Sequence, residues 1–70
     1  MKRYIVAEST NNPRYVCFDM VDGEEVVALT NEEKEAYRFE DVLEAIVAMT
    51  RASKDTKTDW KTIEIEEWEA

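Results

Sequence analysis

Alternation of apolar and polar side chains predicts that the chain begins with β-strands. Residues 3–8 are rich in β-branched and aromatic residues, and a cluster of turn-forming residues follows at 9–13. In residues 14–21, the apolar positions Val16 and Phe18 fall on one face of an extended chain and the intervening positions on the other. This period of two predicts a second strand.

A tight turn is expected to join the second strand to a third. Asp22 and Gly23 match a type I′ turn, in which both central residues need a positive φ. Residues 25–29 are apolar after the first position and are expected to pair antiparallel with residues 14–21.

Residues 30–39 permit two interpretations. Thr30 followed by Glu33 fits a capping box, which would start a helix early. Alternatively, the chain turns at 31–33 and continues as a short extended piece over 36–39 before the helix begins. We favour the second interpretation.

A helical period follows, from about residue 40 to residue 52, and a loop is expected over 53–59. Apolar side chains recur on one stripe, and acidic residues crowd the start of the segment, as the helix dipole prefers. We expect the stripe to pack on the sheet and to place Ile46 in the core. The stripe consists of Val42, Leu43, Ile46, Val47 and Thr50.

Residues 60–68 alternate again and predict the last strand. Ile63 and Ile65 point to one face, and Trp60 and Trp68 point to the other. If the helix covers the isoleucines, both tryptophans lie on an open face, where tryptophan is a frequent interface anchor. The alternative is that they stack against tyrosines of the first two strands in a minor core.

The element order β-β-β-α-β predicts an α+β fold. A small, mainly antiparallel sheet would carry one helix on one face and leave the other face partly open. The chain has 70 residues, no internal repeat and no Gly/Ser-rich linker, so a single domain over 1–70 is expected. A core of this size supplies only about 3–5 kcal/mol of stability.

The composition excludes most of the known types of catalytic site. The chain contains no histidine, which excludes His-dependent triads and His metal sites. Cys17 is the only cysteine, so it forms no intrachain disulfide and no structural zinc site, and we expect it to be a packing residue. Phosphate-binding loops need glycines, and Gly23 is the only one. We therefore expect a protein that is not an enzyme and holds no metal or cofactor.

The net charge of −8 indicates what kind of partner is compatible with the surface. It repels nucleic acid and anionic lipid, so we expect no direct binding to nucleic acid or membrane. A basic protein surface is the natural counterpart, although acidic charge also serves simply to keep small proteins soluble. The N-terminal apolar run stops at Glu8, too early for a signal peptide, and a lone thiol fits a reducing compartment. A cytoplasmic location is expected.

The acidic residues supply the candidate binding site. Same-face carboxylates on a strand repeat about every 6.6 Å, and one helical turn brings Glu40 and Glu44 within about 6 Å. Such an array could engage lysines and arginines that otherwise bind phosphates, or it could be a solvated face without a partner. The predicted partner-binding residues are Glu32, Glu33, Glu40, Glu44, Trp60, Glu64, Glu66 and Trp68.

The whole chain resembles small acidic proteins encoded by phages, and among them anti-CRISPR proteins most of all. The features that carry this resemblance are the Asp22-Gly23 hairpin, the 36–41 segment that leads into the helix, and the acidic closing strand with Trp60 and Trp68. The resemblance implies direct binding to a Cas nuclease or surveillance complex, where nucleic acid is read.

These features lead to one functional hypothesis and three alternatives. The hypothesis is an inhibitory binding protein that occupies a basic nucleic-acid-binding groove through its glutamates, with an aromatic anchor from Trp60 or Trp68. The alternatives are a homodimeric assembly module that pairs through an open sheet face or edge strand, an accessory subunit that regulates an enzyme, and a small enzyme.

Overall fold

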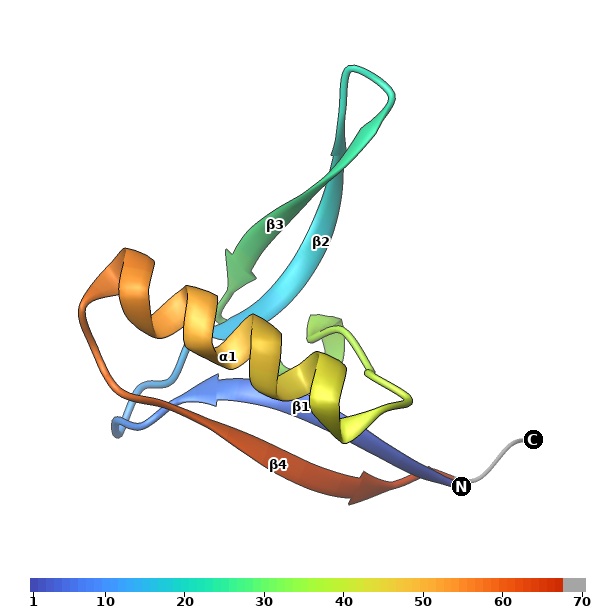
Figure 1. The fold of residues 1–70 in the computed structure, drawn as a ribbon, viewed down its shortest axis with the longest axis vertical. Helices are drawn as coiled ribbons and strands as arrows, with labels where there is room; N and C mark the ends of the chain where they lie inside the picture. Colours follow the sequence, from blue (N-terminus) through green and yellow to red (C-terminus); the bar gives the residue numbers. More distant parts are fainter. Residues whose placement is uncertain (68–70) are drawn as a thin grey trace.

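The computed structural model describes residues 1–67, which form a four-stranded antiparallel sheet and one long helix (Figure 1). The strand order is β3-β2-β1-β4. The predicted α+β fold with the order β-β-β-α-β is confirmed. The elements are β1 (Lys2–Glu8), β2 (Tyr15–Val21), β3 (Glu24–Thr30), a single 3₁₀ turn η1 (Glu33–Glu35), α1 (Val42–Thr56) and β4 (Trp60–Glu66).

The sheet consists of two ladders that meet at one point. β1 pairs with β4 along its whole length, and β2 pairs with β3 in the same way, whereas β1 and β2 pair only between Ala7 and Tyr15. The β2–β3 hairpin therefore projects from the rest of the molecule, and we call it the arm (residues 15–30) (Figure 1). Its turn has φ angles of 51° at Asp22 and 80° at Gly23, which confirms the predicted turn.

An extended segment before the helix occupies the gap between the two ladders. Phe39 and Tyr4 exchange backbone hydrogen bonds of 2.8 and 2.9 Å, and the backbone N–H of Tyr37 donates to the carbonyl of Val16 at 3.0 Å. These bonds satisfy backbone groups of β1 and β2 that no neighbouring strand reaches. The extended interpretation of residues 36–39 is confirmed, and the early helix is excluded.

The core lies between α1 and the sheet. A cluster of buried side chains joins β1, β2, β4, the extended segment and the helix. Ile5 is also fully buried on the opposite face of β1, where it pairs with Ile63 of β4. β1 is thus covered on both faces, as expected of a central strand. The buried cluster consists of Val6, Val16, Phe39, Ala45, Ala52 and Trp60.

Helix α1 begins and ends later than predicted. Asp41 is the N-cap, and its side chain accepts a hydrogen bond from the backbone N–H of Leu43 at 2.9 Å. At the other end, Lys57 adopts a left-handed conformation with φ of 59° and stops the helix. The helical segment therefore includes part of the expected loop over 53–59.

The face by which α1 contacts the sheet also differs from the prediction. The helix packs through the buried Ala45 and Ala52, assisted by the partly buried Ala48 and Met49. The bulky side chains of Val6, Phe39 and Trp60 already fill the space above the sheet, so only small helix residues fit against them. The prediction that the larger stripe packs on the sheet is wrong. Its members are exposed, from 38% at Val42 to 67% at Leu43, with Ile46 and Val47 between these values.

Of the two placements that the sequence leaves open for Trp60, the structure excludes the open face. It is only 7% exposed, and its indole Nε1 donates a hydrogen bond to Thr56 Oγ1 at 2.8 Å. The expectation that Trp60 lies on an open face is wrong, because the helix covers this side of β4 and leaves Ile63 and Ile65 on the opposite side. Trp68 lies outside the described residues.

Candidate binding surfaces

Two surfaces of the arm differ in chemistry because successive strand residues point to opposite faces. The cross-strand pairs Val16–Leu29 and Phe18–Val27 lie on the face toward α1, and the pair Met20–Glu25 continues this face toward the tip. We call this face the apolar face. The opposite face carries the pairs Cys17–Ala28, Asp19–Val26 and Val21–Glu24, and we call it the acidic face.

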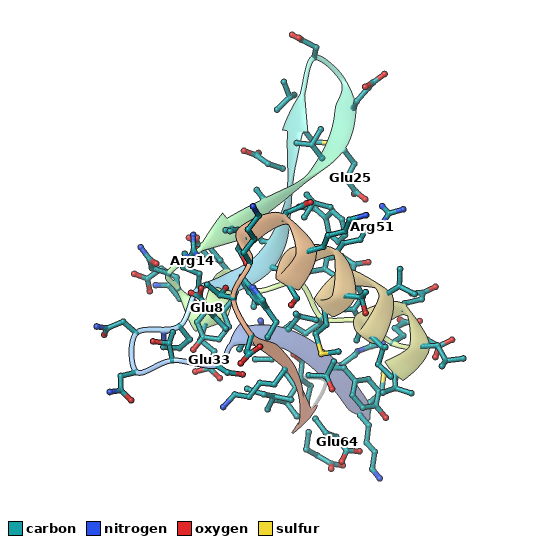
Figure 2. The ribbon with its side chains drawn as sticks, turned by 60° about the vertical axis from the view of Figure 1, so that its left-hand side comes forward. Glu8, Arg14, Glu25, Glu33, Arg51 and Glu64 are labelled. Atoms are coloured by element: carbon teal, nitrogen blue, oxygen red, sulfur yellow. The ribbon has the colours of Figure 1, made fainter. Side chains whose placement is uncertain are left out.

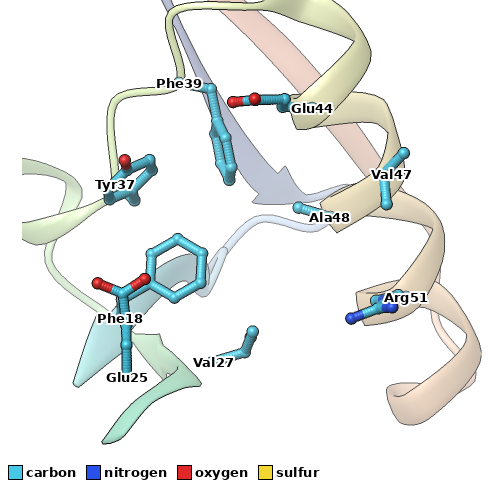
Figure 3. A pocket seen from close by; sticks show the side chains of 9 residues that line it. All are labelled: Phe18, Glu25, Val27, Tyr37, Phe39, Glu44, Val47, Ala48 and Arg51. Atoms are coloured by element: carbon cyan, nitrogen blue, oxygen red, sulfur yellow. The ribbon is translucent and has the colours of Figure 1, made fainter. Parts of the chain in front are cut away.

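An apolar groove separates the arm from helix α1 (Figure 3). Its volume is about 250 Å³, and a neighbouring hollow of about 310 Å³ shares Val27 and Arg51 with it. Phe18 and Val27 line the arm side, and Val47 lines the helix side. The charged groups at the groove are Glu25, Glu44 and Arg51, and the remaining lining residues are Tyr37, Phe39 and Ala48.

Three aromatic rings form one end of the groove. The ring centroid of Tyr37 lies 4.6 Å from that of Phe18 and 4.8 Å from that of Phe39, and both pairs are edge-to-face. Such pairs have a defined geometry and contribute about 0.5–1.5 kcal/mol beyond area burial. The aromatic cluster therefore joins the base of the arm to the extended segment at one end of the groove.

The arm and the turn after it carry most of the net charge. Residues 15–35 contain seven acidic residues and one basic residue, Lys34. On the acidic face, Asp19 and Glu35 line a hollow of about 400 Å³ together with Cys17 and Thr30. Within residues 1–67, the carboxylates of Asp19, Glu24 and Glu35 form no ion pair. This face therefore presents uncompensated negative charge.

The environment of Cys17 suppresses thiol chemistry. Burial raises the pKa of the Cys17 thiol, and the nearby charges of Asp19 and Glu35 raise it further. A thiol with a raised pKa stays protonated and is a poor nucleophile and metal ligand. Over the described part of the chain, no group of three or more His, Cys, Asp or Glu residues is arranged to hold a metal ion.

The predicted acidic residues do not form one continuous surface. Glu33 and Glu64 lie at separate places around the molecule (Figure 2). Glu64 and Glu66 share the edge strand β4, whereas Glu32 and Glu33 lie where the arm ends and η1 begins.

Several of these acids already have a basic neighbour. Glu40 pairs with Arg3 at 2.6 Å and Glu64 with Lys2 at 3.3 Å, and Glu66 lies 3.9 Å from the N-terminal ammonium. Their charge is therefore partly neutralised within the molecule. Glu44 differs from them because it lies at the apolar groove.

A polar cluster around Glu8 escaped the sequence analysis. The carboxylate of Glu8 accepts hydrogen bonds from Arg14 Nε at 3.0 Å, Arg14 Nη2 at 2.8 Å and Thr58 Oγ1 at 2.9 Å. The Arg14 hydrogen bonds hold the pKa of Glu8 at about 2, below its ordinary value of 4.5, although burial opposes this shift. Both carboxylate oxygens are occupied, so the cluster fastens the 9–14 turn to the loop after α1.

The apolar groove was also missed, although its residues were visible in the sequence. The alternation at Val16, Phe18 and Met20 predicts only that they share one face of a strand, and the stripe containing Val47 predicts a core-facing side of the helix. The structure uses alanines for the helix contact and leaves Met20 and Val47 exposed, whereas Val16 is fully buried. The sequence signal that could have shown this is the second helical face, Ala45, Ala48 and Ala52, which spans one side of α1 as continuously as the larger stripe.

No helix among the described residues has the length and apolarity needed to cross a membrane.

Comparisons of the chain with protein-family models, with curated proteins and with solved structures find no match.

Proposed function

We propose that the protein is a non-catalytic binding protein that occupies a basic, nucleic-acid-binding surface of another protein through the acidic face of its arm. The observation that carries the proposal is the uncompensated charge of that face, which projects away from the rest of the molecule. A narrow projecting element can enter a groove that admits a nucleic-acid strand. Occupation of the groove would then inhibit the partner by competition.

The distribution of ion pairs favours the arm over β4 as the recognition element. Lys2 and the N-terminal ammonium partly neutralise Glu64 and Glu66, whereas the carboxylates of the acidic face have no such partner among residues 1–67. Uncompensated charge steers association with an oppositely charged surface. The resemblance to anti-CRISPR proteins would make that partner a Cas nuclease or surveillance complex.

The proposal is tested with a matched pair of double charge reversals. Asp19→Lys with Glu24→Lys changes the acidic face, and Glu64→Lys with Glu66→Lys makes the same change in net charge on β4. Each variant is immobilised and exposed to a bacterial lysate, and the captured protein is then purified. Its binding to labelled DNA and RNA is measured with and without the wild-type chain at low and high salt.

The wild-type chain is expected to displace the nucleic acid from its partner, and the displacement is expected to weaken as salt rises. The Asp19/Glu24 variant is expected to lose about tenfold or more in affinity, whereas the Glu64/Glu66 variant stays close to wild type. Equal binding by both variants, or capture of a partner whose nucleic-acid binding is unaffected, would contradict the proposal.

A further inference from the structure

The largest exposed apolar side chains are concentrated on the arm and on α1. Met20 and Val27 on the apolar face of the arm are 63% and 56% exposed, and Leu43 and Val47 on the helix are 67% and 57% exposed. Val27 and Val47 line opposite sides of the same groove (Figure 3). We call these four residues the arm–helix surface.

We propose that the arm–helix surface binds a second copy of this chain, with the arm of each copy packed against helix α1 of the other. A two-fold arrangement of this kind uses the same surface on both copies, so the arm of one meets the helix of the other twice. The inference does not rest on the proposed function, because it uses the apolar face of the arm rather than the acidic face.

The amount of exposed surface supports a second copy. The chain has a solvent-accessible surface of 5272 Å², whereas a compact monomer of 8.2 kDa is expected to expose roughly 4500 Å². The excess of several hundred Å² is a large part of the ~800 Å² that each partner contributes to a standard interface. A projecting arm and an uncovered helix stripe contribute to a surplus of this kind.

The small core gives a second reason for self-association. The large side chains that are fully buried are Ile5, Val6 and Val16. Chains of this size commonly gain stability from a disulfide, a metal or a partner copy. Cys17 is the only cysteine, so an intrachain disulfide is excluded. An isolated two-stranded hairpin is also marginal in water, and the distal arm gains support if its apolar face is covered.

The groove carries charges of both signs, which a second copy of this chain can match. Glu25 and Glu44 are negatively charged, Arg51 is positively charged, and all three line the same groove. A basic partner would bring positive charge to Arg51, and an acidic partner would bring negative charge to Glu25. A two-fold arrangement instead allows Glu25 of each copy to face Arg51 of the other.

The first test is the oligomeric state of the intact chain over a wide concentration range, measured by sedimentation equilibrium. The wild type is expected to form a dimer. Val47→Glu places a charge in the proposed interface and is expected to raise the dimer dissociation constant about tenfold or more. Val21→Glu is the matched control, because Val21 is 51% exposed but lies on the acidic face. It is expected to dimerise like the wild type.

The second test separates contacts between copies from contacts within one chain. Glu25→Arg alone and Arg51→Glu alone each place like charges together in a homodimer and are expected to weaken it about tenfold or more. When the two variants are mixed, both intermolecular pairs become complementary, and a heterodimer of near wild-type affinity is expected. Circular dichroism of each variant establishes that the single chain is still folded.

Each of the other outcomes overturns the inference. A wild-type chain that stays monomeric at every concentration has no such interface. A dimer that Val47→Glu leaves intact, or that Val21→Glu disrupts equally, uses another surface. Failure of the Glu25→Arg and Arg51→Glu chains to form a heterodimer excludes the proposed pairing. The double variant Asp19→Lys with Glu24→Lys is expected to leave the dimer unchanged. Its effect on binding to the basic partner can therefore be measured separately from dimerisation.

Discussion

At the scale of single residues, Glu8 shows how one carboxylate ties distant segments together. It lies at the end of β1, and its hydrogen bonds reach Arg14 in the following turn and Thr58 in the loop before β4. Thr58 in turn contacts Thr56, whose hydroxyl accepts the hydrogen bond from Trp60. The cluster thus connects the ionised carboxylate to the largest side chain of the core.

The lowered pKa of Glu8 predicts a specific pH dependence of stability. Because the pKa is about 2 in the folded chain and 4.5 ordinarily, the ionised group stabilises the fold above about pH 4.5 and loses this effect as pH falls toward 2. Glu8→Gln is therefore expected to lower the urea midpoint at neutral pH. The difference from wild type is expected to shrink as the pH falls through this range.

Glu64→Gln is the control for this measurement, because Glu64 is exposed and pairs with the exposed Lys2. Its effect on the urea midpoint is expected to be small at every pH. A difference between wild type and Glu8→Gln that stays constant from neutral pH to pH 2 would show that the stabilisation does not come from the carboxylate charge.

At the scale of elements, local signals were sufficient where a short sequence determines its own geometry. Asp22 and Gly23 fixed the hairpin, and the period of two located the strands, because both depend only on neighbouring residues. The face of α1 could not be predicted in this way. It depends on how much room Trp60 and Phe39 leave above the sheet, and these residues come from other parts of the chain.

The same limit applies to the candidate site. The composition identifies an acidic protein, but the predicted binding residues all lie outside the arm, and the sequence could not show that Arg3 and Lys2 pair with Glu40 and Glu64. These pairs join residues far apart in the sequence, and they depend on β1 lying beside β4. The apolar groove depends in the same way on the angle between the arm and the helix.

The packing of α1 predicts opposite outcomes for two neighbouring positions. Ala45 is fully buried, so Ala45→Leu is expected to cost about 1–3 kcal/mol of unfolding free energy through overpacking. Ile46 is 40% exposed, so Ile46→Ala is expected to cost less than about 1 kcal/mol. Urea denaturation of both variants measures the difference. A larger loss for Ile46→Ala than for Ala45→Leu would show that the helix packs through the larger stripe after all.

At the scale of the whole molecule, the two proposed interactions use opposite faces of the arm. The apolar face is oriented toward α1 and carries the proposed contact with a second copy, whereas the acidic face is oriented away and carries the proposed contact with a basic partner. Because the faces alternate along the same strands, one substitution can alter one interaction without altering the other. A dimer would then present two acidic faces to its partner.

The proposed dimer also predicts how thermal stability depends on concentration. A second copy that binds only the folded chain stabilises it by mass action, so the melting temperature of the wild type is expected to rise with protein concentration. The melting temperature of Val47→Glu is expected to stay constant over the same range. A wild-type melting temperature that does not change with concentration would argue against a dimer that binds only the folded chain.

The pairing of β1 with β4 has a consequence for synthesis on the ribosome. β1 emerges first, but its long ladder partner is the last strand of the described chain. The neighbouring arm and helix emerge in between, while β1 still lacks β4 on one side. The apolar side chains of β1 therefore remain without their full cover until β4 has left the exit tunnel. A nascent chain of this topology is therefore expected to need chaperones that cover its exposed apolar segments until β4 has been synthesised.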